Sequence, residues 1–247
     1  MDQTVWIVMI GGIAAGFVQG MSGTAFGITA MAFWAWTLNP ILVGPLVVFG
    51  SLIGQLLSIG TVWRSIDVRR VAPFILGGAV GVPLGVLALR HIDPVLFKFC
   101  VGLLLAIWCP MMLMSRALPR IERGGRVADA AVGLVAGVMG GLGGLTGPAP
   151  TLWTALRGWE RDMQRAVFQA FNLSMHCLTI AAYVSTGTVP NSALPLFAPL
   201  ALAVMLSTFV GVRMYRRFSD ATFRRMLFML LTCSGLILIA TTLPKLL

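Results

Sequence analysis

The stretch GLVAGVMGGLGGLTGPAP, which spans Gly133–Pro150, contains seven glycines and two prolines among its eighteen residues. It lies inside an apolar chain, where an unbroken helix would be the expected structure. Glycine weakens a helix and proline interrupts one. This composition therefore predicts a helix that breaks part of the way along.

A second stretch near the N-terminus has the same pattern. Gly16–Thr37 reads GFVQGMSGTAFGITAMAFWAWT, and a shift of 117 residues places nine of its twenty-two residues on identical ones. These nine are Gly16, Val18, Gly20, Gly23, Gly27, Thr29, Ala32, Trp36 and Thr37. We therefore predict two copies of one unit, each of which opens with a glycine-broken membrane segment.

The composition indicates a membrane protein with several spans. Of the 247 residues, 58% are apolar and 11% are charged, whereas a soluble domain averages about 25% charged residues. Runs such as Val71–Leu89 and Phe99–Met114 carry no charge, as expected of helices that cross a bilayer. The net charge of +10 comes from arginines scattered over short loops. We attribute it to the positive-inside bias of membrane proteins and expect no nucleic-acid partner.

The predicted fold class is an all-α polytopic membrane protein of two inverted repeats. The first repeat covers residues 1–115 and the second 127–247, with a cytoplasmic linker at 116–126. Each repeat is expected to contain one glycine-broken helical hairpin and three transmembrane helices. The hairpins are expected at 5–36 and 127–156, and the spans at 41–63, 71–89, 95–114, 166–185, 194–212 and 223–243.

The basic residues decide how often the broken segments cross the membrane. If each segment crosses once, the basic residues divide eight to ten between the two faces. If each enters and returns to the same side as a hairpin of two short helices, the division becomes 15 to 3. The positive-inside rule favours the hairpins, with the arginine-rich loops cytoplasmic and both termini outside the cytoplasmic (inner) membrane. Inverted repeats with broken helices at corresponding positions are typical of secondary transporters.

The hairpin tips are predicted to meet near the middle of the membrane and to bind an anion. Non-helical backbone is tolerated at that depth only where protein or a water-filled cavity satisfies it. The helix after each tip begins with free N–H groups and the positive end of its dipole, which attract an anion. The candidate substrate-binding residues are Gly20, Ser22, Gly23 and Thr24 in the first copy and Gly140, Gly141, Gly143, Gly144 and Thr146 in the second.

Some of these glycines have an alternative interpretation, because a spacing of four is typical of close helix packing in membranes. The rows with this spacing are Gly12–Gly16–Gly20, Gly133–Gly137–Gly141 and Gly77–Gly81–Gly85. For the last row, packing is the only interpretation. For the hairpin glycines, packing and substrate binding both remain open.

Polar residues on the span after each hairpin are further candidates for substrate binding. A shift of 121 residues pairs Ser51 with Asn172 and Gln55 with His176. Residues four apart share a helix face, and polar groups in membrane helices usually face a bundle interior or a cavity. His176 is also the candidate for proton coupling, because histidine readily changes charge near neutral pH. The alternative is a neutral histidine that is bonded to a backbone carbonyl.

The sequence offers little other chemistry. No cluster of His, Asp and Glu has the spacing of a metal site, and no Ser, His and Asp set suggests catalysis. The glycines at 140–147 match neither a dinucleotide-binding nor a P-loop pattern. We therefore expect no enzyme activity, no metal and no cofactor, with an intramembrane enzyme or an assembly subunit as an alternative.

With these motifs the chain resembles the sulfite exporter TauE/SafE family, also called the toluene-sulfonate uptake permease family. The resemblance rests on GFVQGMSGTAFG and GLVAGVMGGLGG and on the ends of the two repeats, GVPLGVLALRHIDPVLFKFCVGLLL and STFVGVRMYRRFSDATFRRMLFMLL. It implies a cytoplasmic-membrane transporter for a small sulfur-containing anion: sulfite, a sulfonate or a sulfo-carboxylate. The expected partners are this anion and the lipid bilayer. A homodimer and a passive channel for anions or weak acids remain alternatives.

Overall fold

The computed structural model describes residues 3–23, 25–61, 63–114, 121, 124–215 and 220–246, which are helical and contain no strand. Eight of the described helices are long and apolar enough to cross a membrane. They are α1 (Gln3–Ser22), α3 (Pro40–Ser58), α4 (Val68–Leu89), α5 (Pro94–Leu113), α6 (Gly125–Gly143), α8 (Arg161–Ser185), α9 (Leu194–Tyr215) and α10 (Asp220–Thr242). The prediction of an all-helical, multi-pass membrane protein is confirmed.

Each broken segment consists of a long helix followed by a short one. The first contains α1, with 20 residues, and α2 (Phe26–Trp34), with nine. The second contains α6, with 19 residues, and α7 (Pro148–Leu156), with nine. The breaks fall within the predicted tips, at Gly23 and Gly144, whose φ angles are +82° and +72°. The sequence predicted two short helices in each segment, but only the second helix of each is short. Each first helix is about 30 Å long and each second one about half that.

Helices α3 and α5 each start with a capping side chain followed by a proline. Both helices begin with proline, whose missing N–H has no partner to lose at that position. The Asn39 side chain caps α3 by accepting from the Ile41 N–H, and the Asp93 carboxylate caps α5 by accepting from the N–H groups of Val95 and Leu96.

Rows of glycine bring pairs of helices into close contact. A methyl group added at Gly77, Gly81 or Gly85 of α4 would overlap backbone atoms of α6, which confirms the packing interpretation for this row. The same holds between α1 and α9, where a methyl group at Gly20 would overlap the backbone around Gly211. Small residues let membrane helices approach in this way. A third contact of this kind joins α5 to α10 through Gly102 and Gly235.

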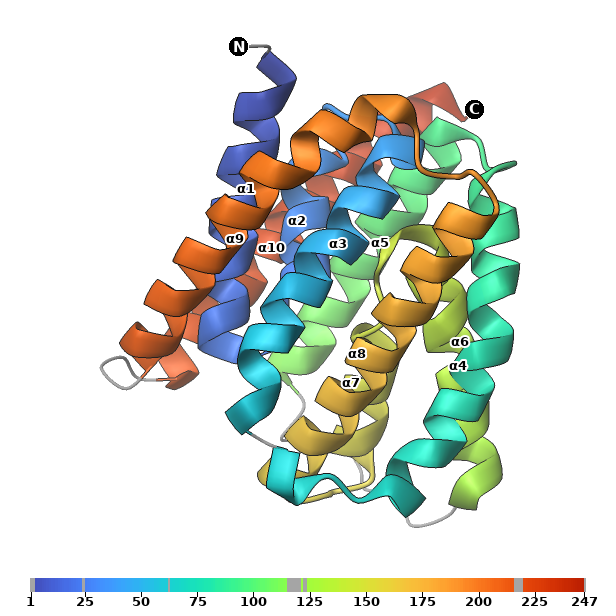
Figure 1. Ribbon diagram of the computed structural model, residues 1–247, viewed down its shortest axis with the longest axis vertical. Helices are drawn as coiled ribbons and strands as arrows, with labels where there is room; N and C mark the ends of the chain where they lie inside the picture. The colour runs from blue at the N-terminus through green and yellow to red at the C-terminus, as the bar shows by residue number, and fades with distance from the viewer. Residues whose placement is uncertain are drawn as a thin grey trace.

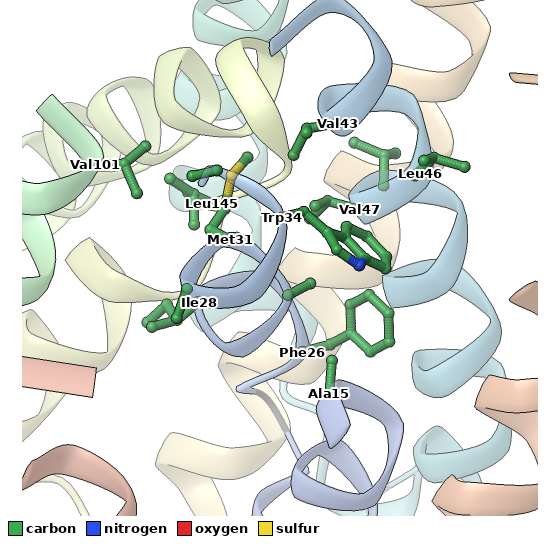
Figure 2. Packing of buried hydrophobic residues seen from close by; sticks show 14 of the residues in the cluster. Ala15, Phe26, Ile28, Met31, Trp34, Val43, Leu46, Val47, Val101 and Leu145 are labelled. Atoms are coloured by element: carbon green, nitrogen blue, oxygen red, sulfur yellow. The ribbon is translucent and has the colours of Figure 1, made fainter. Parts of the chain in front are cut away.

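The short helix α2 is held inside the bundle, with eight of its nine residues buried. Figure 2 shows its side chains packed among those of α3, α5 and the loop between α6 and α7. The labelled residues are Phe26, Ile28, Met31 and Trp34 of α2, Val43, Leu46 and Val47 of α3, Val101 of α5, Leu145 of the loop and Ala15 of α1. The Trp34 indole N–H also donates to the Ile7 carbonyl over 3.2 Å, which ties α2 to α1.

Indole hydrogen bonds also fix the second short helix, α7. The Trp153 indole N–H donates to the buried Asp129 carboxylate over 2.7 Å, which ties α7 to α6. The Trp108 indole N–H donates to the Pro148 carbonyl over 2.9 Å, which ties the start of α7 to α5. Each nine-residue helix is therefore held to a neighbouring helix by at least one hydrogen bond from a tryptophan indole.

Both ends of the chain lie at one end of the bundle, and the junctions between α3 and α4 and between α7 and α8 lie at the other (Figure 1). Ten of the arginines that were expected on one face lie in the described residues, near helix ends. They are Arg64, Arg69, Arg70, Arg126, Arg157, Arg161, Arg165, Arg213, Arg224 and Arg225. The other five, Arg116, Arg120, Arg123, Arg216 and Arg217, lie outside the described residues.

Candidate functional site

A small buried cavity lies between α3, α8, the start of α2 and the loop that joins α6 to α7. Its volume is about 10 Å³, close to the minimum for one water molecule, so an oxyanion fits only if the surrounding helices move apart. Six residues singled out in the sequence line it: Ser51, Gln55, Gly144, Thr146, Asn172 and His176. The other lining residues are Gln19, Gly27, Ile28, Leu145, Gly147 and Pro148.

The four polar residues paired by the shift of 121 all reach this cavity. Ser51 and Gln55 come from α3, and Asn172 and His176 come from α8. The two helices pack side by side and run in opposite directions (Figure 1). None of the four is more than 3% exposed. The repeat therefore brings two pairs of polar groups, 121 residues apart in the chain, to one buried place.

These four residues carry polar atoms that make no hydrogen bond with the described residues. The atoms are Ser51 Oγ, Gln55 Oε1, Asn172 Oδ1 and His176 Nδ1. An unpaired buried polar group costs about 1–3 kcal/mol, and most such groups in folded proteins are paired. Four in one cavity are the usual mark of a place where a polar ligand supplies the missing bonds.

The loop between α6 and α7 forms one wall of the cavity. Gly144 ends α6 in the left-handed conformation, and its N–H donates to the Gly140 carbonyl over 2.7 Å. The Tyr183 hydroxyl donates to the Gly141 carbonyl over 2.7 Å, which fixes this turn to α8. Beyond the turn, the Thr146 hydroxyl lies 3.4 Å from His176 Nε2. Thr146 thus presents its hydroxyl to α8 across the cavity.

The predicted residues of the first tip lie outside the cavity lining. The Ser22 hydroxyl donates to the Val18 carbonyl over 2.8 Å and accepts from the Ala25 N–H over 3.2 Å, so it shapes the turn. Gly20 packs against α9. A methyl group on Gly23 would lie 2.9 Å from Gln169 Nε2. Thr24 lies outside the described residues.

Of the predicted glycines of the second tip, only Gly144 lines the cavity. A methyl group on Gly141 would overlap the backbone of α4 around Val82. One on Gly140 would lie 2.5 Å from Thr146 Cγ2, and one on Gly143 would lie 2.5 Å from Met31 Cε. These three glycines therefore make room for neighbouring groups, whereas Gly144 forms the cavity wall.

The two short helices expose fewer N–H groups than the sequence led us to expect. At α2, the Phe26 N–H already donates to Gln19 Oε1 over 3.1 Å. At α7, Pro148 and Pro150 have no N–H to offer. Gly147, the residue before α7, lines the cavity. Most hydrogen-bond donors at this site are therefore side-chain groups, and the backbone contributes fewer.

Gln19 and Gln169 are buried polar residues that the sequence interpretation missed. Both amide nitrogens point to the Gly23 carbonyl, at 3.1 Å for Gln19 and 3.4 Å for Gln169. With its bond from Phe26, Gln19 joins the end of α1 to the start of α2. The sequence does contain a signal for Gln19, because an amide side chain within an apolar stretch of a membrane helix usually faces the protein interior.

A polar stripe along α8 leads from the arginine-rich end of the bundle to the cavity. It runs through Arg165, Gln169, Asn172 and His176, at intervals of four, three and four residues, so that all share one helix face. Thr179 continues the face beyond the cavity lining, and its buried hydroxyl makes no hydrogen bond with the described residues. Extending the predicted Asn172–His176 face in both directions would have identified these residues.

No group of three or more His, Cys, Asp or Glu side chains within the described ranges is placed to hold a metal ion. The cysteines Cys100, Cys109, Cys177 and Cys233 are free. The chemistry available at the cavity is therefore hydrogen bonding by hydroxyl, amide and imidazole groups.

Comparison with models of protein families gives a match over residues 8–238, to the family described as Sulfite exporter TauE/SafE. No curated protein and no solved structure matches the chain in the corresponding comparisons. The match covers both glycine-broken segments and the cavity between them.

Proposed function

The chain belongs to the sulfite exporter TauE/SafE family, whose members are membrane transporters of sulfur-containing anions rather than enzymes, and we propose that the anion binds in the cavity between α3 and α8. The observation that carries this proposal is the convergence of Ser51, Gln55, Asn172 and His176 on one buried place with unpaired polar atoms. Polar groups at membrane depth are costly, and they mark substrate pathways in transporters.

The cavity offers the groups that an oxyanion needs. The hydroxyls of Ser51 and Thr146, the amides of Gln55 and Asn172 and the N–H of Gly147 are able to donate to sulfonyl oxygens. Hydrogen bonds to a charged group are stronger than neutral ones. In this proposal the anion is held by neutral donors, and His176 is the candidate for carrying a coupled proton.

We further propose that the two repeats are related by inversion, with residues 1–115 and 127–247 as the two copies and 116–126 as the linker. Exchange of the copies maps the α1–α9 contact onto the α6–α4 contact, and both are lined by glycine. The α3–α8 and α5–α10 contacts map onto themselves. This pattern of partners is the one expected of inverted repeats built on broken helices.

Transport then requires the cavity to open toward each side in turn. In the structure it is too small for an oxyanion, so the described conformation corresponds to a closed state. Rocking of one repeat against the other, with α2 and α7 carried along by their tryptophan anchors, would open it. We place the arginine-rich loops in the cytoplasm and both termini outside, in accord with the positive-inside rule.

Purified protein in liposomes tests this function. Radiolabelled sulfite or methanesulfonate is expected to enter with saturable kinetics, and unlabelled anion inside the vesicles is expected to accelerate entry of the label. Such counterflow requires a carrier. Uptake that rises linearly with concentration, without counterflow, would show a passive channel instead, and no uptake of either anion would contradict the proposal.

A further inference from the structure

No Lys or Arg side chain is among the described residues that line the cavity and could neutralise an anion. α1, α2, α3 and the 144–147 loop contain no charged residue. On α8 the nearest cation along the stripe is Arg165, whose guanidinium reaches the first break, since its Nε would lie 3.3 Å from a methyl group on Gly23. Arg165 is not among the residues that line the cavity. Among the described residues that line the cavity, His176 is the one titratable group.

Because no Lys or Arg is among the described residues that line the cavity, we expect it to bind dianions more weakly than monoanions. The cost of transferring an ion into a medium of low dielectric constant rises with the square of its charge, so a dianion is penalised about four times as much as a monoanion of the same size. Hydroxyl and amide donors supply a limited number of bonds, and they compensate one negative charge far better than two.

The unpaired amide oxygens give a second reason for the cavity to prefer hydrogensulfite over the sulfite dianion. Gln55 Oε1 and Asn172 Oδ1 are acceptors that make no hydrogen bond with the described residues. Of the two protonation states of sulfite, the dianion has no proton for these oxygens, and its second negative charge adds to their repulsion. Hydrogensulfite carries one proton and is able to donate it to one of these oxygens while its other oxygens accept from Ser51 and Thr146.

We infer that the cavity selects monoanionic sulfur oxyanions, namely hydrogensulfite and sulfonates, over the dianions sulfite and sulfate. This inference rests on the proposed function and restricts its substrates to monoanions. Because sulfite takes up its proton near neutral pH, the preferred species of that substrate becomes scarcer as the solution turns alkaline.

Isothermal titration calorimetry on the full chain in detergent separates charge selection from protein titration. Methanesulfonate is a monoanion throughout, so any change in its Kd from about pH 6 to about pH 8 reports titration of the protein alone and is expected to be smaller than the change for sulfite. The apparent Kd for sulfite is expected to rise toward about tenfold per pH unit, because only the protonated fraction binds. Sulfate is expected not to bind at concentrations that saturate the protein with methanesulfonate.

The variant His176→Gln serves as the control for titration of the protein. It is expected to bind both anions more weakly and to keep the difference in their pH dependence. Three results would overturn the inference: equal pH trends for sulfite and methanesulfonate, a difference between the two trends that vanishes in the variant, or sulfate binding as tight as that of methanesulfonate. If none of the three anions binds the unmodified protein, the proposed function fails and the inference with it.

Discussion

Gly27, in the first turn of α2, lies against the carbonyl oxygen of Gly144 at the end of α6, so that a methyl group on Gly27 would come within 2.8 Å of that oxygen. Gly27 and Gly144, 117 residues apart in the chain, thus lie against each other beside the cavity and bring the start of α2 to the second break. Contact this close leaves no room for a side chain.

We therefore expect Gly27→Val to separate the two breaks and to lower transport in liposomes at least about tenfold, since misplacement of about 1 Å is enough for losses of that order at a positioned site. Gly60→Ala is the matched control, because a methyl group at Gly60 meets no atom within 4 Å. Normal transport by Gly27→Val would show that the contact between the breaks is not needed.

Replacing an unpaired cavity amide is expected to stabilise the protein while abolishing its function. Asn172→Leu removes a buried polar group that lacks a partner, which removes a penalty of about 1–3 kcal/mol. The melting temperature of the anion-free protein should rise, and anion binding should be lost. Both are measurable on the purified protein by thermal unfolding with and without methanesulfonate.

Thr179→Val provides the comparison, because the Thr179 hydroxyl is also buried and unpaired among the described residues but does not line the cavity. It should raise the melting temperature without changing transport. A loss of transport in Thr179→Val equal to that in Asn172→Leu would argue that unpaired groups along α8, and not the cavity, determine activity.

The side-chain hydrogen bonds of Gln19 are expected to stabilise the turn between α1 and α2. Gln19→Met keeps the side-chain length but removes the bonds to Gly23 and Phe26, at an expected cost of about 1–3 kcal/mol. Transport should fall together with stability. Gln164→Met, which removes a side-chain bond to the Trp159 carbonyl far from the cavity, should leave transport unchanged. Equal effects of the two variants would contradict a special role for Gln19.

The sequence was sufficient to identify the four polar residues that α3 and α8 bring to the cavity, because the repeat shift and the helix spacing agree there. The shift of 121 pairs Ser51 with Asn172, and the spacing of four places Gln55 and His176 on the same faces. In an apolar helix, such a pattern leaves polar groups few places other than a shared interior. The same reasoning correctly assigned Gly77, Gly81 and Gly85 to helix packing.

Other features depend on geometry that glycine spacing does not encode. The density of glycine located each break to within a few residues, and the exact position follows from a positive φ at Gly23 and Gly144. Whether Gly141 faces a ligand or a neighbouring helix depends on where α4 lies. Gln19 was missed because its partners are backbone groups of a turn that had not yet been located.

The proposed membrane orientation makes a prediction of its own. Single cysteines at positions 65 and 160, introduced as Ser65→Cys and Glu160→Cys into a chain without its native cysteines, should both be modified only after the cytoplasmic face becomes accessible to an impermeant maleimide. His91→Cys should react from the opposite face. If positions 65 and 160 report opposite faces, each broken segment crosses the membrane once and the hairpin proposal is wrong.

The most direct test of the central claim is the position of a bound anion. Hydrogenselenite is a monoanion with the shape of hydrogensulfite, and its selenium is located by anomalous scattering in crystals of the protein. The account predicts a selenium peak between α3 and α8, with its oxygens within hydrogen-bond reach, about 2.7–3.2 Å, of Ser51 and Asn172. A peak confined to the arginine-rich helix ends, with the cavity unchanged, would contradict it.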